Sequence, residues 1–245
     1  VLSFAPVMFS FGGIDLIGIT AGEVENPDKT IPRAINQVIW RILIFYVGTM
    51  AVLMALSPWN LVGKEASPFV QIFTDIGIPA AANILNFVVL TAAISVYNSA
   101  IYSNSRMLYG LSTDGNAPEF LRKLSLKKVP VNGILVSSGI TLIVVAINFF
   151  APEQAFMYML SITIGAAVIS WAAIVITHMK FRQKRQNNLP KFKSIGYPLT
   201  NYFCLAFLIG ILALMLTMPE MRMAVFILPI WIGAIYLGYR YKISN

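Results

Sequence analysis

Long apolar stretches separated by short polar segments run through the whole of this 245-residue chain. Each stretch is close to, or longer than, the roughly 20 residues that a helix needs to cross the hydrocarbon core of a bilayer. We therefore predict an all-α transmembrane protein that forms a single membrane domain over residues 1–245. The predicted spans are seven and cover residues 3–24, 32–56, 80–110, 132–150, 155–177, 197–217 and 224–241.

The composition agrees with a lipid environment. Hydrophobic residues make up 58% of the chain and charged residues 11%, whereas about a quarter of the residues of a soluble domain are charged. The net charge of +8 would suggest nucleic acid in a soluble protein, but here the basic residues lie between apolar runs. That distribution favours membrane topology, and we expect no nucleic-acid partner.

The basic residues also predict an orientation. Sixteen of the 18 Lys and Arg residues lie in or beside the segments that follow spans one, three, five and seven, and Lys64 and Arg222 lie on the opposite side. Basic residues close to span ends stay cytoplasmic, so the first span should run inward and the carboxyl terminus should be cytoplasmic. A first span that enters from outside, without a signal peptide, predicts amino-terminal helices of the same protein that are missing here.

The first span contains two features that disfavour a continuous helix. Gly12 and Gly13 are adjacent, and glycine weakens a helix interior. Asp15 places an ionisable group near the middle of the bilayer, which costs at least about 2.5–3.5 kcal/mol on insertion scales and usually marks a pathway. We predict a break here, where freed backbone groups can hold a small zwitterion. Close helix packing at the glycines is the alternative.

Polar residues recur along the third span at alternating steps of four and three, which places them on one helical face. We expect this face to lie against protein or water, and hydrogen bonds between helices would explain it without a substrate. The residues of this stripe are Thr91, Ser95, Asn98, Tyr102, Ser105 and Tyr109.

The remaining candidates lie near the predicted membrane surface. Glu23 stands in a turn of mixed charge at the inner end of the first span, where we expect a gate; a solvated loop before a proline-started helix is the alternative. His178 ends the fifth span beside Lys180 and Arg182 and needs no ligand role there. Cys204 is expected to be a small buried hydrophobe. Phosphate loops, metal-ligand spacings and nucleophile elbows are absent from the sequence, so we expect no catalytic residue, metal or cofactor.

Two strings carry a resemblance to a known family. FSFGGIDLIGITAGEVENPDKTIPRAINQV resembles the sixth-helix signature of the amino acid permeases in the amino acid–polyamine–organocation superfamily. VVLTAAISVYNSAIYSNSRMLYGLSTDGNAP, followed by VPVN, resembles the eighth helix and next loop of the same permeases, especially the bacterial aromatic amino acid and phenylalanine permeases. The resemblance implies a LeuT-like inverted-repeat transporter fold, of which this chain is a carboxyl-terminal part. That part holds helices six to twelve, the second repeat plus two extra helices.

The resemblance also implies a site. The broken sixth helix would pair with a broken first helix, absent here, to bind the amino and carboxylate groups of an amino acid substrate. Asp15 stands where the family usually has Glu, so the charge is kept with a shorter reach. Glu23 matches the second acid of the pattern, and Asn98 is expected to help hold the broken segment. The residues implied to line the substrate side are Phe9, Ser10, Phe11, Gly12 and Gly13.

The expected function is secondary active uptake of an amino acid, specifically an aromatic one, by alternating access across the bacterial inner membrane. The proton as coupling ion is implied by the family alone. One alternative is a permease for proline, 4-aminobutyrate or lysine, since the strings are shared across those substrates. A non-transporting nutrient sensor of the same fold is another. A membrane enzyme would have to use Glu23 with His178, the one candidate pair near the interface.

Overall fold

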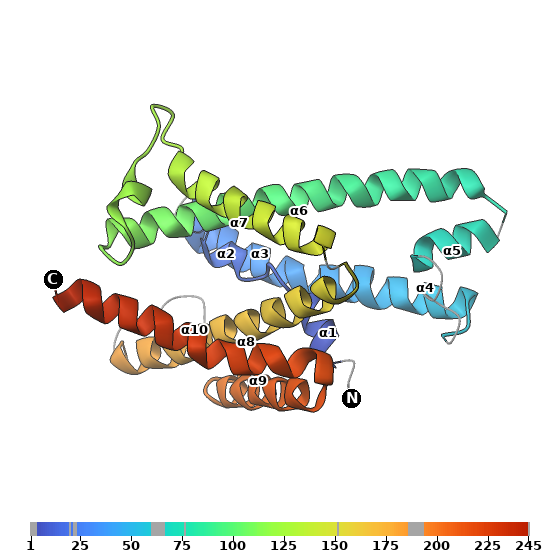
Figure 1. Cartoon of the computed structure of the whole chain (residues 1–245). Coiled ribbons are helices and arrows are strands. Elements are labelled where there is room, and N and C mark those ends of the chain that lie inside the picture. Colours follow the sequence, from blue (N-terminus) through green and yellow to red (C-terminus); the bar gives the residue numbers. More distant parts are fainter. Residues whose placement is uncertain are drawn as a thin grey trace. The chain divides into compact units, whose positions relative to one another are not determined.

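The computed structural model describes residues 4–19, 21, 24–59, 67–75, 77–150, 152–185 and 194–244. Over these residues the chain forms helices joined by turns, without a strand, as Figure 1 shows. The prediction of an all-α protein is therefore confirmed. The chain divides into two compact units, one of Val1–Gly18 with Ser138–Asn245 and one of Ile19–Ser137.

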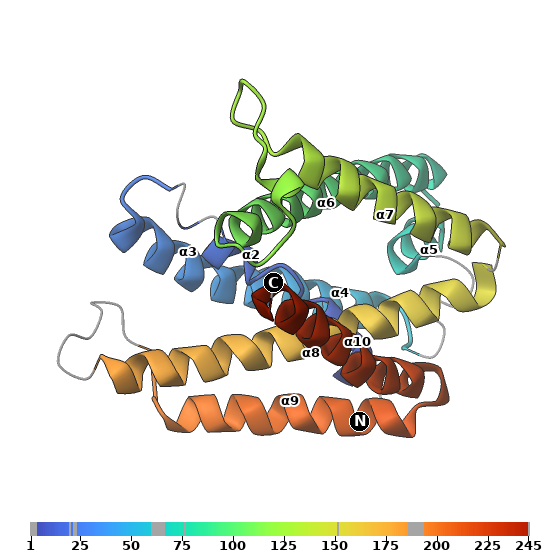
Figure 2. The ribbon, with the colours of Figure 1, turned by 60° about the vertical axis from the view of Figure 1, so that its left-hand side comes forward.

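The first unit is built on three long helices, α8 (Pro152–Lys184), α9 (Leu199–Thr217) and α10 (Pro219–Ser244), against which the short α1 (Phe4–Phe9) packs. Figure 2 shows α8 and α9 running side by side, with α10 across them. Where α8 meets α10, a Cβ on Gly165 would lie 2.7 Å from Leu228 Cδ1. The buried side chains that form the core recur at helical spacing and are Ala5, Ile164, Val168, Leu208, Ile211, Met215, Met221 and Ala224.

The second unit begins with one long helical segment. It starts at Pro27, directly after Asn26 with its left-handed φ of 51°, and comprises α3 (Pro27–Arg41), the π-helix η2 (Ile42–Val47) and α4 (Gly48–Leu56). Proline suits a first helical position because its missing N–H would have no partner there. The turn and proline-started helix expected after the first span are thus present.

The second unit continues with α5 (Pro68–Asp75), α6 (Pro79–Thr113) and the short 3₁₀ turn η3 (Glu119–Arg122), and includes the start of α7 (Val131–Phe150). The end of α6 and the start of α7 meet closely: Gly133 is buried, and a Cβ there would lie 3.0 Å from both Cα and O of Ser105. The connection between them is held by side chains, since Ser112 Oγ donates to the Pro118 carbonyl at 2.8 Å and Asn132 Nδ2 donates to the Phe120 carbonyl at 2.6 Å. Glycine at 133 permits this close approach.

Within the described residues, six helical segments are long and apolar enough to cross a membrane, by length and composition. They coincide with predicted spans two to seven and are Pro27–Leu56, Asn83–Thr113, Val131–Phe150, Phe156–Lys184, Leu199–Thr217 and Pro219–Arg240. The stretch predicted as the first span, 3–24, is not a continuous helix, so a seventh crossing there stays a prediction. The predicted elements omit α5, although Phe69, Ile72 and Phe73 have the spacing of one helical face.

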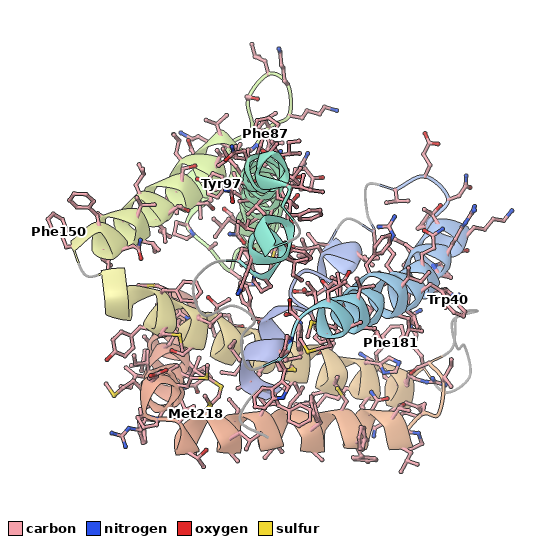
Figure 3. All side chains as sticks on the ribbon, turned by 90° about the vertical axis from the view of Figure 1, so that its right-hand side faces the viewer. Trp40, Phe87, Tyr97, Phe150, Phe181 and Met218 are labelled. Atoms are coloured by element: carbon pink, nitrogen blue, oxygen red, sulfur yellow. The ribbon has the colours of Figure 1, made fainter. Side chains whose placement is uncertain are left out.

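Many large apolar side chains lie on the outside of these helices. Figure 3 labels Trp40, Phe87 and Phe150 among them, and Phe87 and Phe150 are 67% and 84% exposed. A water-soluble protein rarely exposes contiguous apolar surface on this scale. Together with the six apolar helices, these side chains describe a multi-pass membrane protein.

The contact between Gly133 and Ser105 generates a stability prediction. We expect Gly133→Ala to destabilise the protein by about 1–3 kcal/mol, because the added methyl group overpacks a fixed backbone contact. Gly110→Ala is the matched control, since nothing lies within 4 Å of its Cβ position and alanine stabilises a helix relative to glycine by up to about 1 kcal/mol. The apparent melting temperature in detergent should fall for Gly133→Ala alone, and equal values for the two variants would contradict the prediction.

Candidate functional site

The break predicted in the first apolar stretch is present. Helix α1 ends at Phe9 and α2 (Leu16–Ile19) begins at Leu16, and residues 10–15 between them form consecutive turns. The three amides starting at Ser10 each donate to the carbonyl three residues earlier at 3.0–3.2 Å, and the three amides starting at Leu16 do the same at 3.0–3.4 Å. The α-helical ladder of four-residue steps is therefore interrupted twice within one apolar stretch.

The two glycines have separate roles in this break. Gly13 has a φ of +92°, which residues with a side chain rarely adopt. At Gly12 a Cβ would lie 3.2 Å from the carbonyl oxygen of Phe9. The atoms nearest to both Cβ positions belong to the same segment, Phe9 O and Leu16 Cδ1. In the described part of the chain the glycines therefore serve the turn itself, and the alternative of close packing with another helix is not seen.

The break leaves backbone polar groups without partners. Among the described residues, the N–H groups of Gly13, Ile14 and Asp15 and the carbonyl of Gly12 make no hydrogen bond. In lipid an unsatisfied backbone group costs several kcal/mol, so non-helical backbone at membrane depth occurs where protein, water or a ligand completes it. A short stretch of chain thus presents both donors and an acceptor to a polar guest.

Asp15 adds a carboxyl group to the same turn. Its side chain is half-buried, and within the described residues it has no ion-pair or hydrogen-bond partner. An ionisable side chain inside an apolar span is expensive and is usually paired or faces a pathway. The carboxyl group is therefore available to a cation that the described residues do not supply.

One half of the break is fixed by the protein core. Ala5 is fully buried among side chains of α8, α9 and α10, and the Phe4 and Phe207 rings meet edge to face with centroids 6.4 Å apart. Phe9, one turn beyond Ala5, is 55% exposed, and Ser10 is also exposed. The core thus anchors α1, while Phe9 and Ser10, two of the residues predicted to line a substrate, are exposed.

Two hydroxyl groups of the polar stripe on α6 bond to the backbone of their own helix. Thr91 Oγ1 donates to the Val88 carbonyl at 2.9 Å, so this hydroxyl finds its partner on its own helix. Ser105 does the same with Tyr102 and is buried against α7. Near Ser105 the stripe therefore lies against another helix, but its hydroxyl bonds within α6, so the interhelical hydrogen bond of the alternative is not seen at this residue.

Two predicted site residues remain predictions. Asn98 is exposed in its own unit, and the break belongs to the other unit, so its expected contact with the broken segment is untested. Glu23 lies outside the described residues. The predicted gate and the pairing of Glu23 with His178 therefore stay untested. His178 itself stands within α8, which continues to Lys184, whereas the predicted span ended at residue 177.

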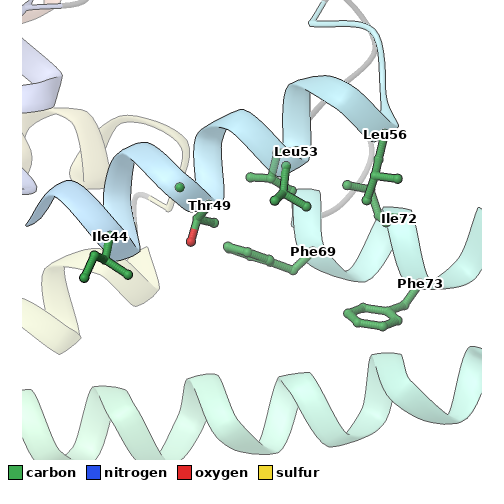
Figure 4. Close-up of a pocket in the computed structure, with 9 residues that line it drawn as sticks. Ile44, Thr49, Leu53, Leu56, Phe69, Ile72 and Phe73 are labelled. Carbon is green, nitrogen blue, oxygen red and sulfur yellow. The ribbon is translucent and has the colours of Figure 1, made fainter. Parts of the chain in front are cut away.

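A separate cavity of about 500 Å³ lies between α5 and the segment formed by η2 and α4 (Figure 4). Of its lining side chains only Thr49 carries a polar atom. A zwitterion needs charged or hydrogen-bonding groups, which this cavity lacks, so the break remains the candidate site. The lining residues are Ile44, Gly48, Thr49, Val52, Leu53, Leu56, Phe69, Ile72 and Phe73.

Broken apolar helices with free backbone groups hold small polar substrates in membrane transporters. Comparison with known proteins bears on the family of the chain. The family model described as amino acid permease matches residues 1–245. The chain belongs to the amino acid permease family. Its curated relatives are named as transport proteins and permeases.

Two relatives illustrate the similarity. The permease chain is 49% identical over 244 residues to the aromatic amino acid transport protein AroP of Escherichia coli strain K12, which covers 99% of this chain and 53% of that protein. It is 46% identical over 242 residues to the amino-acid permease AapA of Bacillus subtilis strain 168, covering 98% and 52%. The chain thus spans about half the length of the curated relatives it matches. No solved structure matches it.

The positive φ of Gly13 generates a prediction about the break. We expect Gly13→Ala to lower the stability of the full-length protein by about 1–2 kcal/mol, the cost of placing a Cβ in the left-handed region. Gly18→Ala in the neighbouring α2, where nothing lies within 4 Å of the Cβ position, should be neutral or slightly stabilising. Thermal unfolding in detergent compares the two, and an unchanged melting temperature for Gly13→Ala would count against the turn.

Proposed function

We propose that this permease chain takes part in the uptake of an amino acid, and the helix break at Gly12 and Gly13 is the observation that carries the proposal. An amino acid is a zwitterion and needs both acceptors and donors of hydrogen bonds. The unpartnered carbonyl of Gly12 is suited to the substrate ammonium. Helices beyond this chain would complete the carboxylate side.

An aromatic amino acid is the substrate we propose. Relatives that are 49% identical to this chain are named aromatic amino acid transport proteins. Phe9 precedes the turn and Phe11 lies within it. The exposed ring of Phe9 and the half-buried ring of Phe11 can pack edge to face with a third ring, an arrangement worth about 0.5–1.5 kcal/mol beyond burial. A permease for proline, 4-aminobutyrate or lysine is the rival, and the relative AapA carries only the general name of amino-acid permease.

The proton is the coupling ion we propose, with Asp15 as a candidate carrier. A carboxylate without a partner in an apolar span is costly when charged, and protonation removes that cost. If the transporter closes around its substrate only when Asp15 is protonated, each uptake event also carries a proton inward. Rocking of one helix group against another would then alternate access to the site across a bacterial inner membrane, with the carboxyl terminus cytoplasmic.

Replacement of Gly13 by leucine tests the break as a transport site. In cells that express the full-length protein, we expect Gly13→Leu to reduce initial uptake of labelled phenylalanine at least about tenfold, because strain of about 1–2 kcal/mol at the turn corresponds to roughly 5- to 30-fold and the side chain also fills the site. Gly210→Leu on α9, whose Cβ position has nothing within 4 Å, is the control with equal bulk. Normal uptake by Gly13→Leu at equal membrane abundance would refute the site, and competition by unlabelled amino acids identifies the substrate.

Proton coupling is tested at Asp15. A protonophore should abolish accumulation of labelled substrate. Asp15→Asn should also abolish accumulation, but it should leave intact the exchange of labelled for unlabelled substrate at equal concentrations on the two sides of the membrane. Asp15→Glu retains the acid and should retain accumulation. If Asp15→Asn accumulates substrate like the parent protein, another group carries the proton, and if the protonophore has no effect, the coupling ion is different.

A further inference from the structure

The junction between α8 and α9 lies far along a helix that is longer than a bilayer is thick. Helix α8 has 33 residues, or about 50 Å at 1.5 Å per residue, against a hydrocarbon core of about 30 Å. Its carboxyl-terminal turns, which carry His178 and Arg182, are therefore at the level of the lipid headgroups. Polar structure at this junction meets lipid phosphates and not acyl chains alone.

The side chains of His178, Asn201 and Tyr197 form a cluster of direct contacts at the junction. Asn201 Nδ2 and His178 Nδ1 are 3.0 Å apart, and Asn201 is 6% exposed. With Asn201 donating to Nδ1, the neutral imidazole carries its proton on Nε2, which has no hydrogen-bond partner among the described residues. The His178 ring also meets the Tyr197 ring edge to face, with centroids 5.7 Å apart. The imidazole is held in place with a free donor.

Arg182 is held beside the same cluster. Its guanidinium lies 4.2 Å from the centroid of the Tyr197 ring, a close cation–π contact. The contact is with the ring face, so it uses none of the guanidinium N–H groups as hydrogen-bond donors to an oxygen, and such groups are suited to phosphate oxygens. Within the described residues Arg182 has no acidic partner. One ring thus positions two nitrogen donors from successive turns of α8.

Two adjoining cavities lie at this cluster. One, of about 290 Å³, is bordered by Ser194, Thr200 and Asn201 together with Val175 and Cys204, and its lining is mostly apolar. The other, of about 430 Å³, is almost wholly apolar and runs along α8 past Ala173, Thr177 and Phe181. Ile174 and His178 line both. Apolar spaces that meet at a polar cluster match a molecule with an acyl chain and a headgroup.

The basic residues at the junction favour a headgroup with a negative charge. Lys180 and Lys184 accompany Arg182 in the last turns of α8, and Arg185 follows directly. The sequence contains no acidic residue between Glu153 and Glu220. Basic residues beside a span attract anionic lipids. The local excess of positive charge is therefore uncompensated over a long stretch of sequence.

We propose that the α8–α9 junction is a binding site for an anionic phospholipid. The phosphate is bound by the guanidinium of Arg182 and by Nε2–H of His178, and an acyl chain lies in the apolar cavity along α8. The apolar cavity distinguishes a lipid from free phosphate, which would use the donors of Arg182 and His178 alone. The proposal does not depend on the identity of the transported substrate.

Lipid retention tests the proposal. The full-length protein is purified in detergent and titrated with phosphatidylglycerol or phosphatidylcholine of identical acyl chains, and the bound lipid is counted by native mass spectrometry. We expect phosphatidylglycerol to be retained over phosphatidylcholine. Arg182→Gln should weaken phosphatidylglycerol binding about fivefold, and Arg182→Lys should weaken it less. Arg222→Gln on α10 removes the same charge from a position outside the junction and should have no effect.

Each outcome decides the proposal. Equal retention of the two lipids by the parent protein, or equal behaviour of Arg182→Gln and Arg222→Gln, would overturn it. Displacement of phosphatidylglycerol by millimolar inorganic phosphate, with no dependence on acyl chains, would assign the site to free phosphate and overturn the lipid assignment. If Arg182→Gln fails to fold, His178→Gln and the lipid preference of the parent protein decide the question, since neither requires that variant.

Discussion

The fold depends on the need of every backbone N–H and C=O group in lipid to find a hydrogen-bond partner within the protein. Continuous helices meet that need over the six long apolar segments of the described residues. Residues 10–15 are an exception, because Gly13 turns the backbone into the left-handed region and two helical ladders end there. A break of this kind persists in a bilayer only when protein, water or a ligand satisfies the freed groups, which is why we propose the turn as the substrate site.

The packing around the break explains how it is held in place. Helix α1 has only six residues, too few to be stable alone. Its position comes from Ala5 and Phe4, which pack against the core of α8, α9 and α10. The turn that follows contributes little to that core and is largely exposed. Rigid support on one side and open polar groups on the other are what a binding site requires.

The junction between α8 and α9 shows how polar contacts gather where a helix leaves the hydrocarbon. The hydrogen bond between His178 and Asn201 and the stacking of Arg182 on Tyr197 join the end of α8 to the start of α9 and the turn before it. These contacts satisfy polar side chains at the depth where apolar packing ends. They also hold the imidazole of His178 and the guanidinium of Arg182 near one end of α8, and lipid phosphates are the abundant anions of the headgroup layer.

Neighbouring residues alone are enough to predict the apolar segments that become helices, the break at Gly12 and Gly13, and the family. Both signals are local. Hydropathy reflects how one segment partitions into lipid, and a glycine reflects the conformational freedom of one residue. Helix α5 and the extension of α8 past His178 are also local features, which the predicted elements missed. The approach of Ser105 to Gly133 and the cluster around Asn201 emerge only in three dimensions. They arise from contacts between segments distant in the chain, and a one-dimensional pattern does not specify which faces meet.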